Sequence, residues 1–148
     1  MNELRELYQE MIIDHGRHPR NVGALAGANH QKEGFNPLCG DKIIIYIKEK
    51  NGVIEEIQFE GSGCAISMAS ASLMTTLLKD KNKKNIDELF MTFHRSVTEG
   101  VSSPELGKLS VFVGVREFPA RVKCATLAWH TLKAALTDDT SLVTTEEN

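Results

Sequence analysis

Long apolar runs, an excess of positive charge and paired cysteine motifs are all missing from this sequence. No apolar run approaches the roughly 18 residues of a membrane span, and the N-terminal stretch MNELRELYQEM lacks the apolar segment of a secretory signal. A formal net charge of -3 provides no basic surface for collecting phosphates, so nucleic acid is not an expected partner. We therefore expect a cytoplasmic protein that binds neither membranes nor nucleic acid.

Cysteine is scarce, because the chain has three and no two of them form a CxxC pair. The missing pair argues against a thioredoxin-like redox site and against a zinc ribbon. In a reducing cytosol the three thiols stay free, bind a metal or react. Three scattered cysteines can also be small buried side chains, so their sequence neighbours have to decide between these interpretations.

The length and composition predict one folded domain. The 148 residues suffice for a single core, and 41% hydrophobic with 25% charged residues are ordinary globular values. No internal repeat or low-complexity segment is visible. We expect the domain to cover residues 1–137 and residues 138–148 to form a short polar tail.

Apolar spacing and turn residues predict the order of the elements. The dipeptide Asn51-Gly52 separates two β-rich runs in residues 42–60 and predicts a β-hairpin. Residues 105–118 fit a strand by composition and a helix by the Pro104-Glu105 start, so their conformation stays open. Helices are predicted over residues 3–15, 65–79, 87–94 and 121–136, and loops over 79–85 and over 20–37, the latter with room for a short edge strand.

Each cysteine lies at a boundary between predicted elements. Cys39 is in the turn NPLCGD, and Asp41, two residues later, can face the same side of an extended chain. Cys64 opens the helix that follows GSG, and Cys124 is placed in the first turn of the last helix. The partial positive charge of a helix N-terminus favours the thiolate, which is the form that binds metals and attacks sulfur.

Three sulfurs and one carboxylate have the composition of a complete tetrahedral zinc site. The sequence alone does not show whether the four side chains converge. A shared metal or reactive site and a set of separate buried thiols therefore both stay open at this point.

The histidines give a weaker metal signal. His15 and His18 form an HxxH pair, but Gly16 and Pro19 interrupt a helix there, so capping of the helix C-terminus is favoured over metal binding. The isolated histidines are expected at the surface or in packing contacts: His30, His94 and His130.

Four segments carry a family resemblance. LYQEMIIDHGRHPRN, NPLCGD, GCAISMASASLM and FPARVKCATLAW occur in the order and spacing typical of U-type iron–sulfur cluster assembly proteins, the IscU/NifU N-terminal-like family. The chain resembles this family from about residue 7 to about residue 136, and is most similar to its SufU branch. The resemblance implies an α+β fold of the SufE/IscU type, in which a small antiparallel β-sheet of about three strands packs against several α-helices.

The resemblance also implies the site and its partners. Cys39, Asp41, Cys64 and Cys124 would bind Zn²⁺, and the three cysteines would hold an iron–sulfur cluster if one is carried transiently. A pyridoxal-phosphate-dependent cysteine desulfurase of the SufS type would donate persulfide sulfur, and downstream assembly proteins or apo-proteins would receive the product. Cys39 is the expected acceptor, because its glycine-flanked loop can move while the other two cysteines belong to helices. Arg121 is a candidate contact for an acidic partner or for the sulfur anion, with a plain surface arginine as the alternative.

One departure from the family pattern favours sulfur acceptance over cluster holding. The IscU branch has a histidine immediately before its last cysteine, where this chain has Lys123. The expected function is that of a zinc-dependent sulfur acceptor that activates a desulfurase, rather than a stand-alone enzyme. A scaffold for 2Fe–2S or 4Fe–4S clusters is the alternative, followed by a purely structural zinc domain. A zinc hydrolase ranks below these, because no HExxH or HxE…PCxxC pattern is present.

Overall fold

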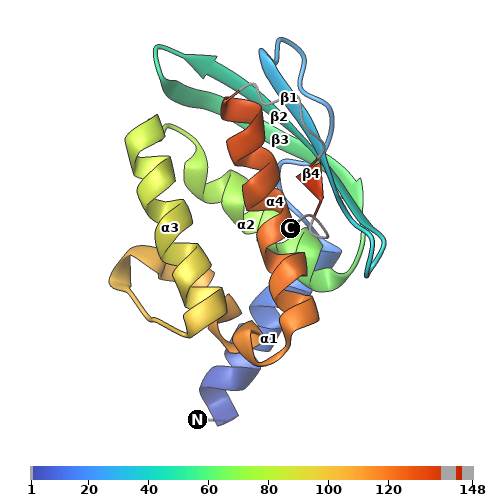
Figure 1. Ribbon diagram of the computed structural model, residues 1–148, viewed down its shortest axis with the longest axis vertical. Coiled ribbons are helices and arrows are strands. Elements are labelled where there is room, and N and C mark those ends of the chain that lie inside the picture. The colour runs from blue at the N-terminus through green and yellow to red at the C-terminus, as the bar shows by residue number, and fades with distance from the viewer. Residues whose placement is uncertain (1, 138–142, 145–148) are drawn as a thin grey trace.

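The computed structural model describes residues 2–137 and 143–144, and the side chains of residues 9–137. Its helices cover one face of a β-sheet. This arrangement confirms the predicted α+β class (Figure 1). No helix in the described part of the chain is long and apolar enough to cross a membrane. The elements are α1 (Asn2–Arg17), β1 (His30–Asn36), β2 (Asp41–Lys50), β3 (Val53–Ser62), α2 (Ala65–Leu78), α3 (Lys83–Glu99), the 3₁₀ segment η1 (Pro104–Glu117), α4 (Pro119–Leu136) and β4 (Val143–Thr144).

The sheet has the strand order β3-β2-β1-β4, with its first three strands antiparallel. The predicted hairpin joins β2 to β3, and Asn51 and Gly52 both have the positive φ values, 54° and 79°, that a type I′ turn requires. The short strand β4 pairs in parallel with β1 at Gly34 and Phe35. It belongs to the predicted polar tail, whose residues 138–142 and 145–148 lie outside the described residues.

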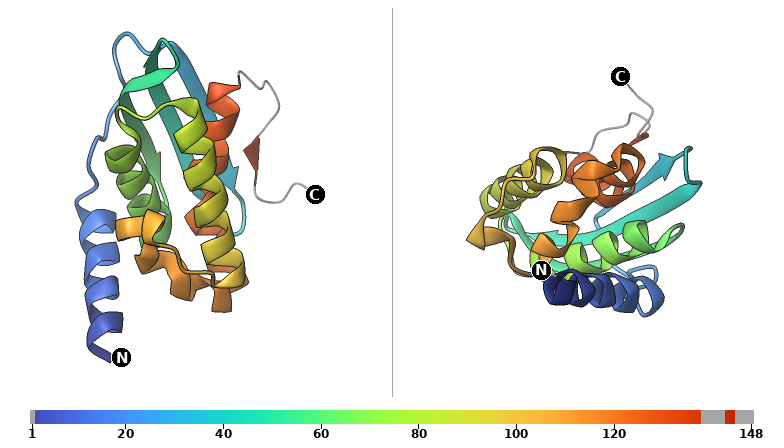
Figure 2. Two further views of the ribbon diagram at one scale, coloured as in Figure 1. Left: turned by 90° about the vertical axis from the view of Figure 1, so that its left-hand side faces the viewer. Right: turned by 90° about the horizontal axis from the view of Figure 1, so that it is seen from below.

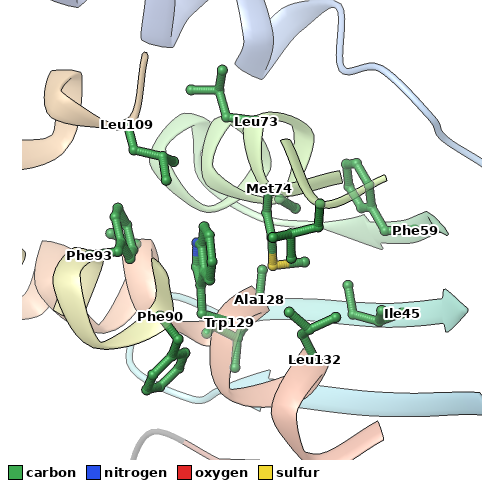
Figure 3. Close-up of a cluster of buried hydrophobic side chains, with 14 of the residues drawn as sticks. Ile45, Phe59, Leu73, Met74, Phe90, Phe93, Leu109, Ala128, Trp129 and Leu132 are labelled. Atoms are coloured by element: carbon green, nitrogen blue, oxygen red, sulfur yellow. The ribbon is translucent and has the colours of Figure 1, made fainter. Parts of the chain in front are cut away.

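The core lies between the sheet and helices α2 and α4. Figure 2 shows α1 running along α2 on the side away from the sheet. Figure 3 shows Trp129 of α4 between Phe93 of α3 and Met74 of α2, and the Phe93 and Trp129 rings stack with centroids 4.9 Å apart. Isoleucines on the inner face of β2 complete this core, with no exposed surface: Ile43, Ile45 and Ile47.

Hydrogen bonds through Ser70 join the two helices that carry cysteines. The Ser70 hydroxyl is buried and donates to the carbonyl oxygen of Ala125 at 2.6 Å. The Ser70 hydroxyl oxygen also accepts a hydrogen bond from Trp129 Nε1 at 3.3 Å. Because buried polar atoms without partners are costly, these contacts fix the position of α2 relative to α4.

Several predicted boundaries differ from the structure. Helix α3 begins at Lys83 rather than at residue 87, because the Asn82 side chain accepts a hydrogen bond from the backbone N–H of Asn85 and caps the helix. The predicted turn over residues 79–85 is correspondingly shorter. The segment 20–37, predicted as a loop with room for a short edge strand, contains the seven-residue strand β1, which lies between β2 and β4 rather than at an edge. The ambiguous segment 105–118 is largely 3₁₀ helix, interrupted where Gly107 has φ 51°.

Candidate metal centre

The four predicted site residues come from three parts of the fold. Cys39 lies in the turn between β1 and β2, at the end of the sheet opposite the 51–52 hairpin turn (Figure 1), and its side chain is exposed. Asp41 is the first residue of β2 and is fully buried. Cys64 is the residue immediately before α2 and is half-buried. Cys124 is buried within α4.

Three of these residues form one group of possible metal ligands. The ligand atoms of Cys39, Asp41 and Cys124 all lie within 4.8 Å of one another, and the Cys39 and Cys124 sulfurs are 3.3 Å apart. Cys64 lies beside this group, with its sulfur 3.9 Å from Asp41 Oδ2. The structure therefore brings the predicted residues together, with three in mutual reach and the fourth in contact with the carboxylate.

Two glycines allow the chain to approach itself here. Gly40 has φ +71°, which permits the tight turn between Cys39 and Asp41. Gly63 has φ +155°, and a Cβ atom at this position would lie 2.2 Å from Asp41 Oδ1. The space left by its missing side chain lets the backbone N–H of Cys64 donate to Asp41 Oδ1 at 2.8 Å. Sequence reasoning treated GSG as a helix boundary and missed this role of Gly63.

The neighbouring Cys124 thiol and the start of α2 both favour a thiolate at Cys64. The Cys64 sulfur accepts a hydrogen bond from the backbone N–H of Ser67 at 3.4 Å, as expected for an N-cap residue. The Cys124 thiol, followed by the backbone amides of Ser67 and Ile66, lowers the pKa of Cys64 to about 7, although burial and the charge of Asp41 oppose this shift.

The prediction for Cys124 is wrong in one respect. Helix α4 begins at Pro119 rather than at residue 121, so Cys124 lies in its second turn and not in the first. The free amides of the helix start are therefore out of its reach. The pKa of Cys124 is raised, because its thiol interacts with the Cys64 sulfur, is buried, and lies within hydrogen-bonding reach of Cys39 and Asp41.

The donor set fits zinc better than it fits magnesium or calcium. Two thiol sulfurs and a carboxylate in mutual reach, with a third sulfur beside them, are typical zinc donors, whereas magnesium and calcium prefer oxygen. Zinc–sulfur bonds of about 2.3 Å in a tetrahedron place sulfurs about 3.8 Å apart. The Cys39 and Cys124 sulfurs, 3.3 Å apart, are close to this distance.

One buried side chain at the site was not singled out from the sequence. Asn36 ends β1 and is fully buried, and its Nδ2 donates to Asp41 Oδ2 at 3.1 Å and to the Cys124 sulfur at 3.4 Å. The asparagine of NPLCGD is three residues before Cys39, and this proximity was the one signal that could have identified it.

The other candidate residues have different surroundings. The Arg121 guanidinium lies over the exposed Phe118 ring, 4.6 Å from its centroid. His15 is buried, and its Nδ1 lies 2.8 Å from the Ser72 hydroxyl of α2. It therefore anchors α1 to α2, which corrects the predicted capping role.

Comparisons with known proteins identify the relatives of this chain. A family model described as the NifU-like N-terminal domain matches residues 7–143. The zinc-dependent sulfurtransferase SufU of Bacillus subtilis is 40% identical over 132 residues, which cover 88% of this chain and 89% of that protein. The iron–sulfur cluster assembly scaffold protein IscU of Streptococcus pyogenes serotype M1 is 38% identical over 138 residues, which cover 92% and 86% of the two chains. A crystal structure of a candidate iron–sulfur cluster assembly scaffold protein for the SUF system, from Fervidobacterium islandicum AW-1, superposes with a TM-score of 0.81 at 33% identity, covering 89% of this chain and 98% of that one.

Proposed function

The chain belongs to the family of NifU-like N-terminal domains, and from this membership we propose that it accepts persulfide sulfur from a cysteine desulfurase in a zinc-dependent manner. Iron–sulfur cluster assembly of the IscU/SufU type is the general function of this family. The finer role as sulfur acceptor rests on the chemistry and exposure of the three cysteines.

The exposure of Cys39 is the observation that carries the proposal. An acceptor thiol has to reach a sulfur carried by another protein, and Cys39 is exposed whereas Cys124 is 1% exposed. The turn around Cys39 is bounded by Gly40 with its positive φ, and Leu38 beside it is 58% exposed. Cys39 is therefore the most accessible of the three thiols, since Cys64 is half-buried and Cys124 is buried.

The transfer step exchanges one sulfur–sulfur bond for another. The Cys39 thiolate attacks the terminal sulfur of the desulfurase persulfide, and a new bond forms between this sulfur and Cys39 Sγ. The sulfur–sulfur bond of the donor breaks, and its electron pair leaves on the cysteine thiolate of the desulfurase. Cys39 then carries the persulfide, and no external oxidant or reductant is needed.

Cys39, Asp41, Cys64 and Cys124 are the residues that would hold zinc. When bound, zinc keeps its cysteine ligands in the thiolate form. Asp41 limits the ligand set to three thiolates, and its Oδ1 is already fixed by the backbone N–H of Cys64. The Cys124 thiol, followed by the backbone amides at the start of α2, lowers the pKa of Cys64 to about 7 even in the metal-free protein.

A scaffold role is the second candidate, because IscU of Streptococcus pyogenes is named a cluster assembly scaffold protein. In that case the three cysteines would hold an iron–sulfur cluster as cargo for downstream assembly or apo-proteins. Lys123 immediately before Cys124 favours the acceptor role, because a lysine ammonium is a poorer metal ligand than a histidine imidazole.

The expected partner is a pyridoxal-phosphate-dependent cysteine desulfurase of the SufS type in the cytoplasm. The exposed pair of Phe118 and Arg121 offers this partner an apolar ring and a cation at the start of α4. Arg121 is therefore proposed as a contact for an acidic group of the desulfurase.

Alanine release from cysteine by the cognate desulfurase tests the proposal. We expect the zinc-loaded protein to raise the rate, and Cys39→Ser to return it to the basal value, because a neutral hydroxyl is a poor sulfur nucleophile. Arg121→Ala should raise the protein concentration needed for half-maximal stimulation, with Arg95→Ala on α3 as the control. A protein that binds zinc yet leaves alanine release unchanged would favour a structural zinc site instead.

A further inference from the structure

We propose that Asn36 is a positioning residue that sets the relative placement of the Asp41 and Cys124 ligand atoms and of the turn that carries Cys39. This inference rests on the proposed function, because it assumes that these residues bind zinc. Asn36 is the last residue of β1 and pairs with Asp41 across the β1–β2 ladder. Its side chain is thus directed at the centre from inside the fold.

One amide group contacts three parts of the site. Asn36 Nδ2 has two N–H bonds, and it donates to Asp41 Oδ2 at 3.1 Å and to the Cys124 sulfur at 3.4 Å. Its Oδ1 accepts from the backbone N–H of Leu38 at 3.3 Å. This last contact is an Asx turn that holds the chain just before Cys39.

The partners determine the orientation of the amide. A carboxylate can only accept and a backbone N–H can only donate, so Nδ2 has to face Asp41 and Oδ1 has to face Leu38. An aspartate at position 36 would place an acceptor against the Asp41 carboxylate. A glutamine would carry the amide one methylene too far for the same contacts.

The two Asp41 carboxylate oxygens accept hydrogen bonds from different donors. Oδ1 accepts from the backbone N–H of Cys64, and Oδ2 accepts from Asn36. The carboxylate is thereby held from both sides in a buried position. Groups that orient metal ligands in this way affect metal affinity about 10–100-fold when they are removed.

Two substitutions separate the contacts of Asn36. Asn36→Ala removes all three, whereas Asn36→Ser keeps an oxygen that can accept from the Leu38 N–H but is too short to reach Asp41 and Cys124. Asn29→Ser is the matched control, because Asn29, which lies immediately before β1, also makes two side-chain hydrogen bonds to β2, with the backbone of Glu49 at 2.7 Å and 2.8 Å. The control lies outside the cysteine site.

Zinc affinity by chelator competition and the visible absorption spectrum of the Co²⁺-substituted protein are the measurements. We expect both Asn36 variants to bind zinc about 10–100-fold more weakly than the wild type and the control. The Co²⁺ bands should shift in position or intensity in the Asn36 variants alone, a change that a loss of fold stability would not produce.

The following outcomes would overturn the proposal. A folded Asn36→Ser protein with wild-type zinc affinity and Co²⁺ spectrum would show that the donor contacts do not position the ligands. If neither Asn36 variant folds while Asn29→Ser does, the residue has a structural role only. Wild-type protein that binds no zinc would refute the proposed function, and this inference with it, whereas a failure confined to the Asn36 variants leaves the proposed function intact.

Discussion

Replacing Gly63 by alanine tests whether the close approach of Asp41 to the start of α2 builds the metal centre. A Cβ atom at this position would lie 2.2 Å from Oδ1 and 2.8 Å from Cγ of Asp41. The carboxylate would have to move by more than about 1 Å to reach ordinary contact distance. This movement breaks its 2.8 Å hydrogen bond from the Cys64 N–H.

The structure sets the size of the effect. The backbone at Gly63 has φ +155°, and an alanine there adds strain on the order of 1–3 kcal/mol. Loss of a hydrogen bond to a charged group adds about 1.5–3 kcal/mol. We therefore expect the free energy of unfolding of the metal-free protein to fall by several kcal/mol, and the zinc affinity to fall at least about 10-fold because the carboxylate ligand is displaced.

The assay compares Gly63→Ala with Gly27→Ala. Gly27 also has a positive φ, +82°, but a Cβ atom there would meet no heavy atom within 4 Å. The control therefore has backbone strain without displacement of a ligand. Urea unfolding measures the stability of both variants, and chelator competition measures their zinc affinity.

Equal zinc affinity in the two glycine variants would refute the reasoning, because it would mean that the position of Asp41 does not determine metal binding. A double-mutant comparison gives a second check. In an Asp41→Ala background, Gly63→Ala should lower the zinc affinity no further, since the group that it displaces is already absent.

The remaining predictions concern titration and the carboxylate. The pKa of Cys64, lowered to about 7 from 9.0, predicts that its alkylation in the metal-free protein rises through about pH 7; peptide mapping checks this, and Cys124→Ala should move the midpoint upward. Burial, followed by the charge of Arg20, lowers the pKa of His15 below 6.5. His15 therefore binds a proton more readily in the unfolded chain than in the folded protein, so the free energy of unfolding should decrease as the pH falls below 6.5. In urea titrations, His15→Gln should flatten this pH dependence. Asp41→Ala should lengthen the lifetime of a reconstituted iron–sulfur cluster several-fold, measured as the decay of its visible absorbance; unchanged cluster lifetime and zinc affinity would leave Asp41 with a turn role only.

The hairpin and the main helices could be predicted from the sequence because their signals are local. Asn51-Gly52 needs positive φ at both positions, and the structure has them. The apolar spacing before Leu136 predicted α4, whose Trp129 is fully buried. Helix starts were less predictable, because the Asn82 cap and Pro119 at the first turn of α4 move the boundaries by a few residues.

The candidate site was predictable in composition and not in its supporting contacts. The motifs identified Cys39, Asp41, Cys64 and Cys124, but the support of Asp41 by Gly63 and Asn36 depends on contacts between strands and helix starts. Sequence spacing carries no information on such contacts, since Asn36 and Gly63 reach Asp41 only after the strands have paired and packed against the helices. The wrong placement of Cys124 has a local cause instead, because Pro119 starts α4 two residues earlier than predicted.

The proposed acceptance of persulfide sulfur by Cys39 is tested most directly by identifying the thiol that receives the sulfur. The protein should be incubated with its cognate desulfurase and cysteine, alkylated, digested and mapped by mass spectrometry. We expect one additional sulfur atom on the peptide that contains Cys39, which is the exposed thiol. In Cys39→Ser, we expect no such addition on the Cys124 peptide. Persulfide on Cys124 rather than on Cys39 in the wild-type protein, or on neither cysteine, would contradict the proposed role of Cys39.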